Sequence, residues 1–122
     1  MARKTKGSDL ERRFAKFGGQ IVIAQSELPD TRAWRHIGDQ LLRSGTAPGA
    51  HYGEALGAQS TNDFIHKLSL ALKEQREAVY WTRVCVEADK APSNAAYLLE
   101  EGGELVAILA ASLRTARRNR DE

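Results

Sequence analysis

The chain of 122 residues is long enough to form one domain with a buried core and too short for two. Its 18 Lys and Arg residues nearly balance 16 Asp and Glu residues, so the formal net charge of +2 does not by itself indicate a nucleic-acid partner. The single cysteine excludes an internal disulfide and a thiolate metal site, and no apolar run approaches the roughly 20 residues of a membrane span, so we expect a cytoplasmic protein without a membrane partner.

The first eight residues show no apolar periodicity and are expected to form a basic arm. A helical domain is expected over residues 9–118, followed by a short tail at 119–122. Ser8 or Asp9 can cap the first helix. Its apolar face is predicted from residues spaced alternately by four and three, which are Leu10, Phe14, Phe17, Ile21, Ala24 and Leu28. Gly18 and Gly19 each cost about 1 kcal/mol relative to alanine, so close packing is expected to offset them.

The second helix is expected to begin after a Thr31 cap. Its predicted buried face consists of Trp34, Ile37, Leu41 and Leu42. Pro48 lies inside the pattern, where it removes one backbone hydrogen bond, so we expect a kink there with the helix continuing to Ala55. The alternative is a break into two helices between Ser44 and Pro48. A turn at residues 57–59 ends this segment.

The third helix is expected to begin at a Ser60 cap, with Asp63 in the position of the acidic partner of a capping box. Its predicted buried face consists of Phe64, Leu68, Ala71 or Leu72, Gln75, Val79, Thr82 and Val86. Pro92 suits the first turn of a fourth helix that runs to about Arg118, with Ala91 or Ser93 near the cap. The segment 105–113 is apolar on nearly every side, which predicts cover by a second chain.

Four amphipathic helices with short connections predict an all-α fold, namely an antiparallel up-down-up-down four-helix bundle with helix two kinked near Pro48. In that topology Gly18-Gly19 and Gly102-Gly103 fall at about the same height on helices one and four. We therefore predict a close crossing of these two helices, with a hinge or break at Gly102 as the alternative.

The central part of the chain carries a family resemblance. It consists of the words RSGTAPGA at residues 43–50 and YGEA at 52–55, then Ser60, Asp63-Phe64, Lys67-Leu68 and residues 71–74. This pattern resembles the signature of small bacterial four-helix-bundle proteins encoded in intervening sequences of large-subunit rRNA genes, one branch of which forms the accessory variability determinants of diversity-generating retroelements. The resemblance covers roughly residues 9–118. It implies a homopentamer that binds RNA or DNA and, in the retroelement branch, a reverse transcriptase partner.

The charges are expected to separate toward the two ends of this bundle. The predicted basic end is a candidate phosphate-binding surface made of Arg3, Lys4, Lys6, Arg12, Arg13, Lys16, Arg114, Arg117, Arg118 and Arg120. The predicted acidic end contains Glu27, Asp30, Glu87, Asp89, Glu100, Glu101 and Glu104. The alternative is that the arginines only complement a helix dipole and keep the tail soluble.

No catalytic residues are predicted, because the sequence contains no phosphate-binding glycine loop and no nucleophile with a neighbouring base. His51, Glu54, Asp63 and His66 flank the central turn at spacings typical of metal ligands on helices, with Glu54 expected opposite Asp63. We expect these four residues to hydrogen-bond one another, so no metal and no cofactor is predicted. Exposed aromatics could stack on bases, but aromatics at helical spacing are more often core residues or subunit contacts; the candidates are Trp34, Phe64, Tyr80, Trp81 and Tyr97.

The sequence therefore favours a non-enzymatic, oligomeric nucleic-acid-binding accessory protein. The first alternative is an oligomeric scaffold that binds only protein. A binder of metal or a small molecule is the second alternative.

Overall fold

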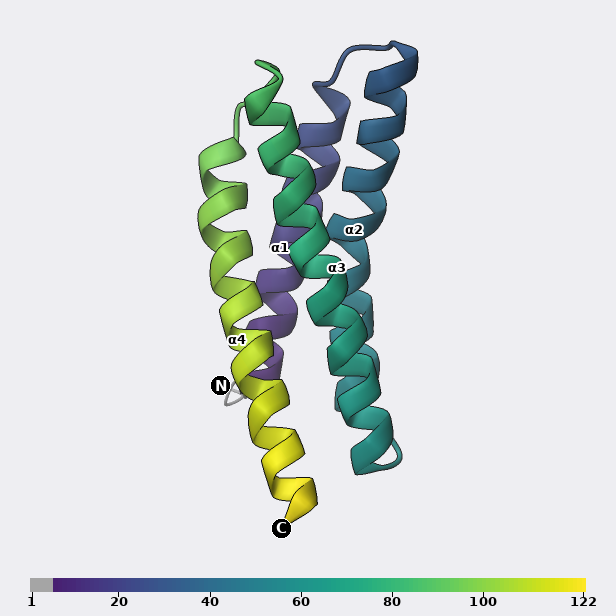
Figure 1. The fold of residues 1–122 in the computed structure, drawn as a ribbon, viewed down its shortest axis with the longest axis vertical. Helices are drawn as coiled ribbons and strands as arrows, with labels where there is room; N and C mark the ends of the chain where they lie inside the picture. Colours follow the sequence, from purple (N-terminus) through teal and green to yellow (C-terminus); the bar gives the residue numbers. More distant parts are fainter. Residues whose placement is uncertain (1–5) are drawn as a thin grey trace, which may run out of the picture.

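The computed structural model describes residues 6–122, and this part of the chain forms four α-helices and no strand (Figure 1). The helices are α1 (Lys6–Ser26), α2 (Arg32–Leu56), α3 (Thr61–Glu87) and α4 (Ala95–Asp121). Helices adjacent in sequence pack together, and a less extensive contact between α1 and α4 closes the bundle. Among the described residues, none of the helices has an apolar stretch long enough to cross a bilayer.

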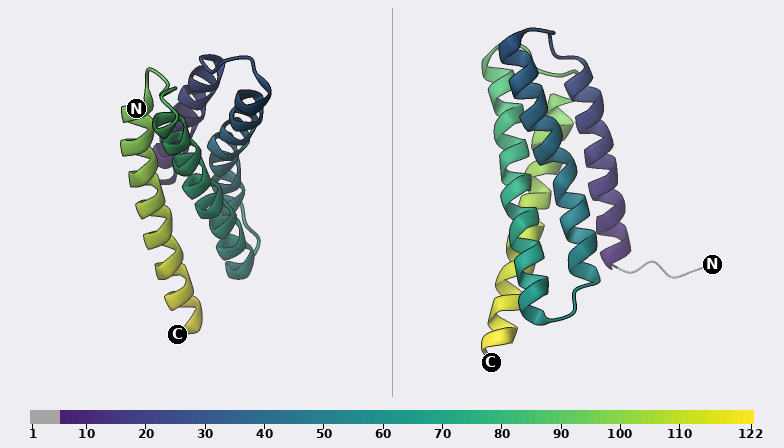
Figure 2. Two further views of the ribbon diagram at one scale, coloured as in Figure 1. Left: turned by 45° about the horizontal axis from the view of Figure 1, so that its top comes forward. Right: turned by 90° about the vertical axis from the view of Figure 1, so that its right-hand side faces the viewer.

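The two ends of the bundle hold different connections. The α1–α2 and α3–α4 connections lie at the upper end in Figure 1, whereas the α2–α3 turn lies at the lower end with the start of α1 and the end of α4. The last turns of α4 extend past the α2–α3 turn, as both figures show (Figure 2). The end of α4 is therefore the most projecting part of the described chain.

Two helix starts agree with the sequence and two do not. The Thr31 hydroxyl accepts a hydrogen bond from the Trp34 N–H at 3.4 Å, and the Ser60 hydroxyl accepts one from the Asp63 N–H at 3.0 Å, which confirms both caps. The predicted start of α1 at residues 8–9 is wrong, because the helix already begins at Lys6. Residues 1–5 of the expected arm lie outside the described residues.

The fourth helix begins later and ends later than expected. It starts at Ala95 after Asn94, so Pro92 precedes the helix, and its buried ring lies in the α3–α4 connection. The prediction that Pro92 occupies the first turn is therefore wrong. At the other end α4 continues past Arg118 to Asp121.

The core is formed mainly by large apolar side chains from all four helices. Fully buried members include Phe17, Ile21, Leu41, Leu68, Leu98, Leu105 and Leu109. On α3 the predicted face is correct at Leu68, Gln75 and Thr82. It is wrong at Val86, which is 37% exposed, because the helix turns Cys85 inward instead.

The apolar segment of α4 needs less cover than its composition suggested. Leu105, Leu109 and Leu113 are buried within the chain itself, whereas Ala107 and Ala111 are exposed. The bundle therefore covers the three leucines of this segment, leaves Val106 and Ile108 partly buried and exposes two alanines. Cover of this segment by a second chain stays a prediction.

Helix α2 is one continuous α-helix through Pro48, whose ring is buried. The alternative of a break between Ser44 and Pro48 is wrong. A bend of the helix axis at Pro48 stays a prediction.

Two glycines of α2 allow α1 to lie close against α2. A Cβ placed on Gly45 would overlap the side chain of Ile21, and one placed on Gly49 would lie 3.0 Å from the Phe14 Cβ. Gly18 also faces α2, near Gly45, and α1 contacts α4 far less extensively than it contacts α2, so the predicted close crossing of helices one and four is wrong.

The glycine pair of α4 has a different role from the one predicted. Gly102 makes room for the side chains of Phe17 and Val79, and α4 continues through it without a break. Gly103 has no neighbour within 4 Å of a built Cβ, and the same is true of Gly19 on α1. A hinge at Gly102 therefore has no support in the helix path.

Candidate nucleic-acid interface

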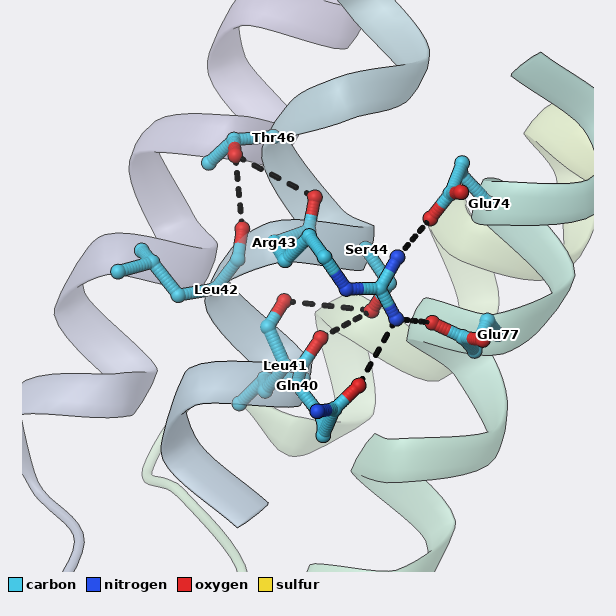
Figure 3. Close-up of polar contacts among 8 residues, drawn as sticks. All are labelled: Gln40, Leu41, Leu42, Arg43, Ser44, Thr46, Glu74 and Glu77. Atoms are coloured by element: carbon cyan, nitrogen blue, oxygen red, sulfur yellow. Dashed lines mark hydrogen bonds and ion pairs between the residues drawn. The ribbon is translucent and has the colours of Figure 1, made fainter. Parts of the chain in front are cut away.

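The first motif residue, Arg43, ties α2 to α3 (Figure 3). One guanidinium nitrogen donates to Glu74 Oε2 at 2.5 Å, and the other donates to Glu77 and, at 2.9 Å, to Gln40 Oε1. The hydrogen bond with Glu77 is the largest cause that raises the pKa of Arg43, so the guanidinium stays charged. Arg43 therefore acts in helix packing, and its charge is not available to a ligand.

The hydroxyl groups of the motif bond to the backbone of their own helix. Ser44 is fully buried and donates to the Gln40 carbonyl at 2.7 Å, while Thr46 donates to the Leu42 carbonyl at 2.7 Å (Figure 3). Such bonds satisfy the hydroxyls locally. With Gly45 packed against Ile21, the motif accounts for how α2 contacts α1 and α3.

The four residues considered for metal do not come together as predicted. None of the four hydrogen-bonds to another of them, and Glu54 pairs with Lys67 at 2.9 Å, a hydrogen bond that lowers the pKa of Glu54. The Nδ1 atom of His51 is buried and has no hydrogen-bond partner among the described residues. The described part of the chain contains no group of three or more His, Cys, Asp or Glu side chains arranged to hold a metal ion.

Two predicted members of the basic end lie against the first part of α4. Arg13 contacts Glu101 at 2.6 Å and Glu104 at 3.0 Å, and the hydrogen bond with Glu101 is the largest cause that raises its pKa. The ammonium group of Lys16 lies 5.5 Å from the centre of the Tyr97 ring, a cation–π geometry. The assignment of Arg13 and the two glutamates to opposite ends of the molecule is wrong.

Of the remaining N-terminal cations, Arg12 is the one whose side chain the structure describes. Arg3 and Lys4 lie outside the described residues, and Lys6 is the first residue of α1. Arg12 is exposed and lies 3.8 Å from Asp9. The predicted cluster that joins both termini therefore stays a prediction for these residues.

The arginines near the end of α4 form a separate group. Arg114, Arg117 and Arg118 are exposed, share one helix face through their spacing, and form no ion pair within the described residues. We call these three residues the α4 arginine face. Arg114 follows Glu104 by ten residues, which places it about 15 Å farther along the helix than the partner of Arg13. Arg120 bonds Asp121 and Asn62 and is not part of this face.

Sequence reasoning missed a second cationic surface. Lys73, Arg76, Tyr80 and Arg83 are all exposed on α3, spaced by three, four and three, and we call them the α3 stripe. None of the three cations forms an ion pair with another described residue, and Tyr80 is 57% exposed. The sequence did contain a signal for this surface, because the helical spacing places these four residues on the side of α3 opposite to the buried Gln75 and Thr82.

Comparison with known proteins assigns the family. Residues 10–111 match the family described as 23S rRNA-intervening sequence protein. The chain belongs to this family. The family match includes the motif and the α3 stripe but ends before the α4 arginine face.

A solved structure shows the same fold as this intervening-sequence family member. It is a crystal structure of a protein with unknown function from the S23 ribosomal protein family of Bacteroides thetaiotaomicron. The two chains are 29% identical with a TM-score of 0.81, and the alignment covers 90% of this chain and 99% of the other. The search of curated proteins gave no match.

Proposed function

We propose that this family member is a non-enzymatic, cytoplasmic homo-oligomer that binds RNA or DNA through the α4 arginine face. The observation that carries the proposal is the set of three exposed arginines without acidic partners at the projecting end of α4. Arginine forms charge-assisted hydrogen bonds with phosphate oxygens, and such contacts do not depend on base sequence. A ring of subunits would repeat this face around its axis.

The family description supports a connection with rRNA intervening sequences. The resemblance to accessory variability determinants adds two finer elements to the proposal, a homopentameric ring and a retroelement reverse transcriptase as partner. Binding of the protein to RNA and to DNA can be measured without knowing the number of subunits or the protein partner.

Reversing two charges of the α4 arginine face tests the proposal. Arg117→Glu with Arg118→Glu is expected to abolish binding to structured RNA and to duplex DNA at low salt, measured by fluorescence anisotropy. Each phosphate contact that is lost also removes about 0.9 from the log–log salt slope on duplex DNA. Circular dichroism is expected to show unchanged helix content, because both side chains are exposed.

The matched control reverses two exposed arginines at the start of α2, at the opposite end of the bundle. Arg32→Glu with Arg35→Glu makes the same charge change and is expected to bind almost as well as the wild type. Equal losses from both pairs, or a wild type that does not bind at low salt, would contradict the proposal.

The second candidate function is an oligomeric scaffold that binds only protein. The observation that favours it is the exposure of two adjacent apolar side chains on α1, Val22 at 50% and Ile23 at 48%. Exposed apolar patches commonly mark protein interfaces. A wild type without nucleic-acid binding would leave this function as the better supported one.

A further inference from the structure

We infer that the α3 stripe binds a single-stranded nucleic-acid segment, with the three cations on its phosphates and the Tyr80 ring stacked on an unpaired base. This inference rests on the proposed function. It adds a second contact surface, distinct from the α4 arginine face, and it specifies the class of strand.

The stripe has the dimensions of a contact along a strand. Lys73 and Arg83 are ten residues apart on one continuous helix, which separates them by about 15 Å along its axis. Arg76 and Tyr80 lie between them on the same face. A rigid helix therefore holds three cations and one aromatic ring in a fixed row.

Three acidic residues lie close to this row in sequence. Glu87, four residues after Arg83 on the same side of α3, is exposed and forms no ion pair with Arg83. Glu74 and Glu77 lie on the side of α3 that faces α2, and both are bonded to Arg43 (Figure 3). No carboxylate of the described chain lies within ion-pair distance of the stripe cations. The row is therefore complementary to a polyanion.

The aromatic residue points to a strand with unpaired bases. Tyr80 is more than half exposed, and its ring contacts the edge of Trp81, with ring centres 5.1 Å apart and planes at 70°. Trp81 itself packs against the core, so the Tyr80 ring rests on a fixed support. A base offers its flat side to such a ring only when it is free of the duplex stack, as in single-strand-binding grooves that combine cations with aromatics.

The experiment uses 5′-labelled oligouridine and oligothymidine of about ten nucleotides and the full-length chain. Fluorescence anisotropy at several salt concentrations measures affinity and salt slope. Lys73→Gln with Arg76→Gln and Arg83→Gln is expected to lower the slope by about 2 on both strands, because each lost contact removes about 0.7. A matched triple variant, Arg32→Gln with Arg35→Gln and Lys90→Gln, removes the same charge elsewhere and is expected to keep the wild-type slope.

The aromatic contact has a separate readout. Tyr80→Ala is expected to weaken binding by about 5- to 150-fold without changing the salt slope, since one stacked base is lost and no phosphate contact. Tyr80→Phe is expected to bind like the wild type, because stacking needs the ring and not the hydroxyl.

Three outcomes would overturn the inference. The first is a stripe variant that binds like the wild type while the variant of the α4 arginine face does not, which would leave the proposed function intact. The second is tighter binding to a duplex than to either single strand, with no effect of Tyr80→Ala. The third is equal losses from the stripe triple and its matched control. A wild type that binds no nucleic acid would instead contradict the proposed function and this inference together.

Discussion

At Gly45 the absence of a side chain sets the distance between α1 and α2. A methyl group there would overlap Ile21, whereas the same group on Gly19 meets open space. Gly45→Ala is therefore expected to lower the free energy of unfolding by about 1–3 kcal/mol through overpacking. Gly19→Ala is expected to raise it by about 0.5–1 kcal/mol, because alanine favours the helix.

Urea denaturation followed by circular dichroism, at one fixed protein concentration, measures both changes. Ile21→Val combined with Gly45→Ala is expected to recover part of the loss, since the smaller side chain makes room for the methyl group. Equal effects of the two glycine substitutions would show that helix propensity, and not the contact with Ile21, dominates at Gly45.

These glycines also show that the sequence does not reveal which neighbour a single residue contacts. The sequence predicted that close packing offsets the cost of Gly18 and Gly19, but a Cβ on Gly18 would make only ordinary contacts with α2, at 3.8–3.9 Å, and one on Gly19 would meet open space. The sequence also could not say which helix lies against Gly18. The partner depends on the rotation of each helix about its axis. The rotation of α3 also explains why Cys85 is buried where Val86 was predicted. Cys85 and Val86 both lie one turn beyond Thr82, on adjacent sides of the helix, so a small rotation decides which of them faces the core.

At the scale of elements, α2 shows how tertiary packing accommodates a proline inside a helix. Pro48 lacks the N–H that would bond to the Ser44 carbonyl, yet the helix continues on both sides and the ring is buried. Pro48→Ala is expected to be near neutral or stabilising. The regained hydrogen bond, about 1 kcal/mol, and the relief of the clash oppose the loss of buried ring carbons at about 0.8 kcal/mol each.

Urea denaturation again measures this change, and Ala50→Gly at an exposed site of the same helix is a suitable comparison, with an expected loss of about 1 kcal/mol. A loss of several kcal/mol from Pro48→Ala would contradict the expectation. It would mean that the proline ring determines the local path of α2 and, with it, the position of the motif.

The number and order of helices could be predicted because apolar periodicity and capping residues are local signals. Thr31 and Ser60 cap their helices as predicted. The start of α4 could not be predicted in the same way, since Asn94 makes no side-chain cap and instead bonds to Gln20 on α1. A tertiary contact replaces the local signal there.

At the scale of the whole molecule, the placement of charge depends on how far each helix slides along its neighbour. α1 has 21 residues and α4 has 27, and the contact of Arg13 with Glu101 aligns the first half of α1 with the first third of α4. The end of α4 therefore projects alone with its arginines. Sequence reasoning identified these arginines but not their separation from Arg13, because the offset between helices is set by core packing.

The apolar surface of the whole molecule leads to the last prediction, that the protein is a homo-oligomer with α1 in the interface. Val22 and Ile23 are both about half exposed, and neighbouring exposed apolar side chains commonly mark protein interfaces. Light scattering at micromolar concentration is expected to give a multiple of the 13.5 kDa chain mass, five in the case of the ring implied by the family resemblance. Val22→Glu with Ile23→Glu is expected to give single chains, because a charge buried in an interface without a partner is costly.

The matched control is Leu56→Glu with Val86→Glu, which places the same charges on two other exposed apolar side chains and is expected to leave the mass unchanged. If the α1 variant keeps the oligomer and the control dissociates it, the interface lies on another face of the bundle. A wild-type mass equal to one chain would contradict the oligomer itself. In that case each protein molecule would carry a single α4 arginine face with three arginines. The contribution of this face to the salt slope on duplex DNA would then not exceed about 3.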